Sequence, residues 1–221
     1  MFKLLLGKSL RYFLLESLVN LQHQIDSMKK ELPIILSIVV LAALYRLIPF
    51  QVEGYSLYNF TPIGAIALFS GTLLGKKLKS ALIPMGIMLL SDLAIQLVGG
   101  IGFHAEMPFV YGAFLLTYFM GRNGLSNKIT GSRILGASVL SSLAFFVITN
   151  FGSWILSPVY TKDLSGLLTC YVAAIPFYNP GDFLSSFALN GLLGDLFFNT
   201  VLFGSYYLIM SAQLKLAKSK A

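Results

Sequence analysis

The chain has 221 residues, of which 56% are hydrophobic and only 11% charged, and its mean hydropathy is +0.77. Soluble domains carry roughly 25% charged residues, so this composition excludes an ordinary soluble domain and favours one bundle of helices in lipid. The formal net charge of +7 is a topology signal and not a nucleic-acid footprint, because the cations gather in the N-terminal arm, two short connectors and the tail. These cations are Lys3, Lys8, Arg11, Lys29, Lys30, Lys76, Lys77, Lys79, Arg122, Lys128, Arg133, Lys215, Lys218 and Lys220.

The N-terminal arm, residues 1–31, has apolar residues at helical spacing, beginning with Leu6, Leu10 and Phe13. Charges scattered through this run, with no small-residue cleavage site after it, argue against a cleaved signal peptide. The pattern predicts an amphipathic helix on the cytoplasmic face. Three roles stay open for it: packing on the underside of the bundle, anchoring to lipid, or docking a partner.

Six apolar segments approach the roughly 20 residues that a membrane-spanning helix needs. They cover residues 32–50, 61–75, 81–98, 108–121, 134–158 and 183–214. The predicted fold is therefore all-α: a six-span membrane domain over 32–214, with a basic tail at 215–221 and both termini cytoplasmic. A seventh span over 164–178 is not expected, because it would be short and would place the basic tail outside.

The connector after the fifth segment contains a further helical pattern. Apolar residues recur at i, i+3, i+4 and i+7 spacing over 164–175, directly behind Asp163, which is a good N-cap residue. This pattern predicts an interfacial helix on the outer side. It either covers a cavity as a lid or fills a gap between spans.

Two acidic residues, Asp92 and Asp195, fall near the middle of the third and sixth segments. A carboxylate in hydrocarbon is costly, so both should face the interior, as functional groups or as simple hydrogen-bond partners of a neighbouring helix. Helical spacing places Gln96 on the face of Asp92 and Asn199 on the face of Asp195. The similar segments 89–93 and 192–196 fit an inverted repeat of three plus three spans, or chance in a Leu-rich chain.

The other polar side chains lie toward the outer ends of the segments, which indicates a cavity open to the outside. Arg46 is expected to reach the interface alone or to pair with Glu53 or Asp92. Trp154 belongs to an outer group of aromatic residues that forms an interfacial belt or stacks on a flat ligand. The predicted ligand-binding residues are Asp92, Gln96, Asn150, Asp195, Asn59, Arg46 and Trp154.

The second segment carries small residues at Gly64, Ala67, Gly71 and Gly75, the last three at four-residue spacing. Such a ridge allows close helix approach, either within the chain or to a partner subunit in the membrane. No phosphate-binding loop, nucleophile elbow or His and Cys metal set is present, so we expect neither an enzyme nor a bound metal or cofactor. His23 and His104 are expected to be surface residues.

Four short motifs carry a resemblance: NFTPIGA at 59–65, SDL at 91–93, NFG at 150–152 and GDL at 194–196. Over 32–214 the chain resembles a family of uncharacterised small bacterial inner-membrane proteins. That family is distantly similar to the substrate-binding S components of energy-coupling factor (ECF) vitamin transporters. The resemblance implies six spans, a loop-capped outer pocket and a small-residue surface that docks a transmembrane coupling subunit driven by two ATPases. S components usually carry that surface in the first span, whereas the best ridge here is in the second.

Three functions are compatible with these patterns. The first is binding and uptake of a vitamin-like small molecule. The second is secondary transport in which Asp92 and Asp195 exchange protons. The third is a non-catalytic membrane assembly subunit that works through the arm and the glycine ridge.

Overall fold

The computed structural model describes residues 40–42, 44–48, 59–75, 78–175 and 187–219. The chain divides into two compact units, Met1–Leu41 and Ala42–Ala221, and the helices below belong to the second. They are α3 (Ile63–Leu74), the short 3-10 helix η1 (Leu78–Ala81), α4 (Leu82–Leu97), α5 (Met107–Met120), the π-helical turn η2 (Gly121–Leu125), α6 (Gly131–Leu156), α7 (Leu164–Ala174) and α8 (Phe187–Ser219). The described residues contain no strand, which confirms the all-α class.

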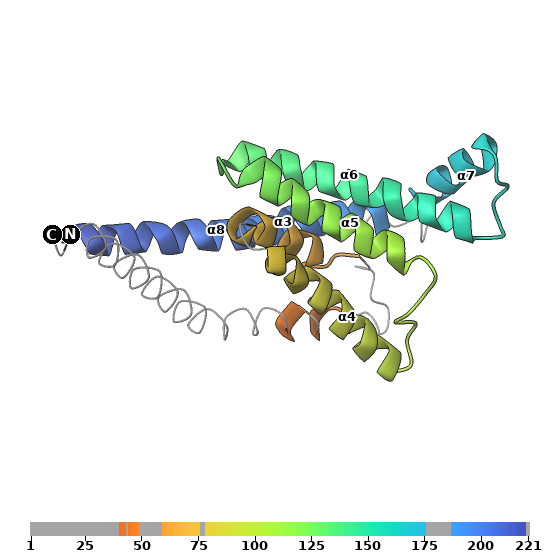
Figure 1. The fold of residues 1–221 in the computed structure, drawn as a ribbon, viewed down its shortest axis with the longest axis horizontal. Coiled ribbons are helices and arrows are strands. Elements are labelled where there is room, and N and C mark those ends of the chain that lie inside the picture. Colours follow the sequence, from red (N-terminus) through yellow and green to blue (C-terminus); the bar gives the residue numbers. More distant parts are fainter. Residues whose placement is uncertain (1–39, 43, 49–58, 76–77, 176–186, 220–221) are drawn as a thin grey trace, which may run out of the picture. The chain divides into compact units, whose positions relative to one another are not determined.

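Helix α3 lies at the centre of the second unit, in contact with α4, α5, α6 and α8 (Figure 1). Nine of the 12 residues of α3 are buried. The small residues of α3 allow neighbouring helices to approach it closely. At Gly71 a side chain would not fit, because a Cβ there would lie 2.0 Å from the backbone oxygen of Tyr118. A Cβ on Gly121 would lie 2.2 Å from the Leu68 oxygen, so α3 and the α5–η2 helix pack backbone against backbone.

The predicted ridge is thus largely used inside the chain. Ala67 is fully buried, and the position of a Gly75 Cβ lies 2.8 Å from the Cγ atom of Arg122. Gly64 faces α8 instead, where its neighbour is the carboxylate of Asp195. Docking of a partner subunit on this ridge stays a prediction.

Helix α6 has its polar residues inside and its apolar residues outside. Its buried residues are Ser138, Ser141 and Gly152, whereas its large apolar side chains, among them Leu140, Leu143 and Val147, are exposed. A soluble bundle shows the opposite arrangement. In the part of the chain described, α6 is the one helix long and apolar enough to cross a membrane, judged by length and composition.

The other helices match the predicted segments in position but several are shorter than a full span. Helices α3, α4 and α5 have 12, 16 and 14 residues. At about 1.5 Å per residue they measure roughly 18–24 Å, less than the ~30 Å hydrocarbon core of a bilayer. The structure therefore confirms a helical bundle and does not establish six spans. The arm 1–31 and most of the predicted first span, 32–50, lie outside the described residues.

Helix α7 occupies the predicted outer segment and starts as expected. The Asp163 side chain accepts a hydrogen bond from the Gly166 N–H at 2.8 Å, which confirms it as the N-cap. The pKa of Asp163 is lowered below its ordinary value of 3.8. The main cause is the hydrogen bond from the Gly166 N–H, and the second is the hydrogen bond that the Thr161 hydroxyl donates at 2.8 Å. Helix α8 runs to Ser219, so the predicted tail at 215–221 continues this helix as far as the structure describes it.

Candidate functional site

A cavity of about 590 Å³ lies between the helices of the second unit. Side chains from α3, α4, α5, α6, α7 and α8 line it, together with the connectors around residues 59–61 and 104–106. Four predicted ligand-binding residues are in its wall: Arg46, Asn59, Asn150 and Asp195. Three others, Asp92, Gln96 and Trp154, are not among the residues that line it.

Asp195 presents one of the carboxylates of the cavity wall, the other being that of Glu106. Its Oδ2 atom accepts a hydrogen bond from the Ser142 hydroxyl of α6 at 2.6 Å. A Cβ on Gly64 would lie only 2.1 Å from Asp195 Oδ1, so α8 places this acid directly on α3 at a point where only glycine fits. Among the described residues no cation forms an ion pair with Asp195. Its negative charge is therefore compensated by one hydroxyl.

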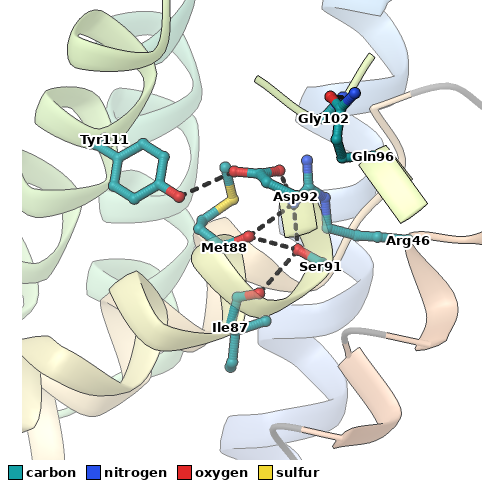
Figure 2. A network of polar contacts seen from close by, with 8 residues as sticks. All are labelled: Arg46, Ile87, Met88, Ser91, Asp92, Gln96, Gly102 and Tyr111. Carbon is teal, nitrogen blue, oxygen red and sulfur yellow. Dashed lines mark hydrogen bonds and ion pairs between the residues drawn. The ribbon is translucent and has the colours of Figure 1, made fainter. Parts of the chain in front are cut away.

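The second acid, Asp92, is arranged differently (Figure 2). Arg46 donates from Nη1 to Asp92 Oδ1 at 2.6 Å and also to the Ser91 hydroxyl, and the Tyr111 hydroxyl donates to Asp92 Oδ2 at 2.9 Å. Asp92 is only 3% exposed, and each carboxylate oxygen has a partner. The expected pairing of Arg46 with Asp92 is therefore present, whereas Glu53 lies outside the described residues. Asp92 lies behind the cavity and holds Arg46 in its wall.

Gln96 shares the helical spacing of Asp92 but not its environment. It is exposed near the end of α4, and its Oε1 atom accepts from the Gly102 N–H at 3.2 Å. A Cβ on Gly102 would lie 1.9 Å from the Asp92 backbone oxygen, so the connector closes tightly over α4. Gln96 secures this connector (Figure 2).

Trp154 secures the connector between α6 and α7. Its indole N–H donates to the Thr161 carbonyl at 2.8 Å, and the Lys162 ammonium lies 5.8 Å from the ring centroid. Lys162 also donates to the Ser157 carbonyl at 2.6 Å and to the Trp154 carbonyl. These bonds hold the turn that leads into α7.

Helix α7 is fixed to α6 beside the cavity. The Cys170 thiol lies 3.4 Å from the Asn150 carbonyl, and the Tyr171 hydroxyl donates to the Val147 carbonyl at 2.8 Å. The Asn150 amide donates to the Phe146 carbonyl at 2.8 Å within its own helix. Because Cys170 and Asn150 both line the cavity, α7 forms part of its wall.

Asn59 occupies the turn before α3. Its φ angle is +66°, in the left-handed region that Asn tolerates better than most residues. Its carbonyl accepts from the Thr61 N–H at 2.9 Å, and Asn59 and Thr61 both line the cavity. This turn brings the NFTPIGA motif to the site.

Comparison with known proteins places the chain in a family. Residues 26–218 match the Family of unknown function (DUF6580). The chain belongs to this family. The match includes the whole of the predicted membrane domain, 32–214, and agrees with the expected membership of an uncharacterised family. No curated protein and no solved structure matches the chain.

Several residues of the site were not expected from the sequence. Ser142 and Tyr111 bind the two acids. His104 is exposed, as predicted, and it also lines the cavity, with its Nδ1 atom 3.0 Å from Glu106 Oε2. The spacing of Ser138 and Ser142 on an apolar helix was the available signal for a polar inward face. Tyr111 carried no local signal, because its partner lies on another helix.

Proposed function

We propose that this chain is a membrane-embedded protein that binds a small molecule in the cavity beside Asp195. The cavity volume of about 590 Å³ falls in the range of about 300–1,000 Å³ typical of ligand sites. Its wall combines aromatic side chains, among them Phe114 and Phe145, with many polar ones. Ligand sites likewise combine apolar surface with polar groups that orient the ligand. Uptake of the bound molecule, as in S components, is the role that the resemblance suggests.

Embedding in a membrane is supported by the surface of the helices. Leu89 and Leu93 of α4, Leu116 of α5 and Phe197 of α8 are exposed, as are the apolar side chains of α6. So many exposed apolar residues on neighbouring helices are typical of contact with lipid. We place the basic connectors on the cytoplasmic side, with several spans and both termini inside. The short helices are accommodated by their protein surroundings.

The observation that carries the binding proposal is the unneutralised carboxylate of Asp195 in the cavity wall. Asp195 is half-buried, and a partly desolvated charge with one hydroxyl partner is costly unless a further group completes its hydrogen bonds. Asp92 does not share this property because Arg46 neutralises it. A ligand group is the natural partner for the remaining lone pairs of Asp195.

The test is to purify the protein in mild detergent from its own host and to identify by mass spectrometry any small molecule released on denaturation. We expect a stoichiometric ligand in the wild type and its loss in Asp195→Ala. Gln96→Ala is the matched control, because Gln96 lies outside the cavity wall. A wild type that carries no ligand, or a ligand retained equally by Asp195→Ala, would contradict the proposal.

A second candidate function is proton-coupled transport, and the unequal surroundings of the two acids favour Asp195 as the exchanging group. Asp92 is held by Arg46 and Tyr111, whereas Asp195 faces the cavity with one hydroxyl partner. In liposomes, uptake of the identified ligand would then depend on an imposed pH gradient. That dependence would be lost in Asp195→Asn and retained in Gly112→Ala, which lies outside the cavity wall. Uptake indifferent to the gradient would exclude this function.

A further inference from the structure

We propose that the ligand is an organic cation with an apolar or aromatic body, bound through its positive nitrogen to the carboxylate of Asp195. This inference rests on the proposed binding function and names the substrate class. Three features carry it: the free hydrogen-bonding capacity of Asp195, the charge balance of the cavity wall, and the aromatic side chains beside it.

Asp195 has capacity for an ammonium group. A carboxylate offers about four lone-pair sites, and the hydrogen bonds of the described residues fill one, from Ser142 at 2.6 Å. Asp195 Oδ1 lies against the backbone of Gly64, so the nitrogen of the ligand would approach the carboxylate from the cavity. An ammonium or a protonated secondary amine would supply both the missing donors and the missing positive charge, as a charge-assisted hydrogen bond.

The remaining charges of the wall do not offset Asp195. Arg46 is the described cation in the wall, and its charge is balanced by Asp92 at 2.6 Å. The other acid of the wall, Glu106, pairs with His104 at 3.0 Å. Even with His104 protonated, the wall keeps the negative charge of Asp195. An anionic ligand would meet a guanidinium whose positive charge Asp92 already balances.

The wall also suits an apolar body. Phe114 of α5 and Phe145 of α6 have ring centroids 4.9 Å apart, and both line the cavity together with Phe146 and Val110. Asp195 is hydrogen-bonded to Ser142, one turn before Phe145 and Phe146 on α6. Aromatic faces attract cations as well as apolar surface. The site thus combines a carboxylate anchor with a wall that binds the body of an amine.

The experiment compares three probes that share a phenyl ring and a short spacer and differ in the end group: 2-phenylethylamine, 2-phenylethanol and phenylacetate. Binding to the full chain in detergent is measured by thermal shift and by ligand-detected NMR. We expect the amine to bind the wild type about tenfold or more tightly than the other two probes, which corresponds to about 1.4 kcal/mol. In Asp195→Asn the amine should fall to the level of the alcohol, while Gln96→Ala and Gly112→Ala, both at positions outside the cavity wall, keep the preference.

Binding of phenylacetate as tight as that of the amine, an amine preference that survives in Asp195→Asn, or no measurable amine binding would overturn the inference. The molecule released from the wild type on denaturation provides a second readout that needs no variant. A released ligand with a cationic nitrogen supports the inference, and a neutral or anionic one overturns it while the binding function stands. A wild type that neither retains a ligand nor binds the probes overturns both.

Discussion

The substitution Gly64→Ala tests the contact on which the site depends. The new Cβ would lie 2.1 Å from Asp195 Oδ1 and 2.9 Å from its Cγ, whereas ordinary contacts begin at 3.4 Å. The carboxylate must therefore move by roughly 1 Å, or α3 and α8 must separate. Either movement strains or breaks the 2.6 Å hydrogen bond from Ser142.

The expected loss of stability follows from these terms. Overpacking lowers the free energy of unfolding by about 1–3 kcal/mol, and loss of a hydrogen bond to a partly buried group lowers it by about 1–3 kcal/mol more. The better helix propensity of Ala than of Gly raises it by about 1 kcal/mol. We expect a net loss of about 2–4 kcal/mol in the free energy of unfolding. The measurement is denaturant unfolding of the purified chain in mild detergent, followed by circular dichroism. Amine binding should weaken in parallel, because the anchor moves.

Two controls isolate the contact. Gly112→Ala on α5 introduces a methyl group with no atom within 4 Å, so we expect no loss of stability and a gain of up to about 1 kcal/mol from helix propensity. In the Asp195→Ala background the added methyl on residue 64 meets no carboxylate, and Gly64→Ala should then cost less than about 1 kcal/mol. An equal loss in both backgrounds, or a Gly64→Ala protein as stable as Gly112→Ala, would refute the reasoning.

Three further predictions concern other parts of the structure. Asp92→Asn leaves Arg46 without its counter-charge at a largely buried position. The free energy of unfolding should then fall by about 3 kcal/mol in the same assay. An unchanged value would contradict the pairing. The Asn199 amide donates to the Ser138 hydroxyl at 2.5 Å, while its Oδ1 atom has no hydrogen-bond partner. Ser138→Ala alone should therefore lower the free energy of unfolding by about 1–3 kcal/mol, whereas Ser138→Ala combined with Asn199→Leu should leave it almost unchanged. A double variant less stable than Ser138→Ala would refute this. Because the pKa of Asp163 is lowered by folding, its capping of α7 is complete above its ordinary pKa of 3.8 and is lost as the pH falls through the lower folded value. Hydrogen exchange of the α7 amides should accelerate over that range beyond the intrinsic rate, and Asp163→Asn should abolish the additional dependence.

The helices and their ends could be predicted from local patterns. A helix forms from contacts three and four residues apart, so the apolar periodicity of 164–175 and the N-cap at Asp163 already specified α7 (Leu164–Ala174). The cost of a carboxylate in an apolar segment likewise singled out Asp92 and Asp195. Composition was enough to indicate an all-helical chain.

The roles of these residues depended on contacts between distant segments. Asp92 pairs with Arg46, 46 positions away, and Asp195 with Ser142, 53 positions away, and no local pattern encodes such partners. Gln96 shares the helical face of Asp92 yet is exposed near the end of α4, because helical spacing does not reveal which turn is covered. Gly64 and Gly71 belong to one ridge, but one meets a carboxylate and the other a backbone carbonyl. Packing of α8 and α5 against α3 made that distinction, since side chains acquire partners only when separate helices are brought together.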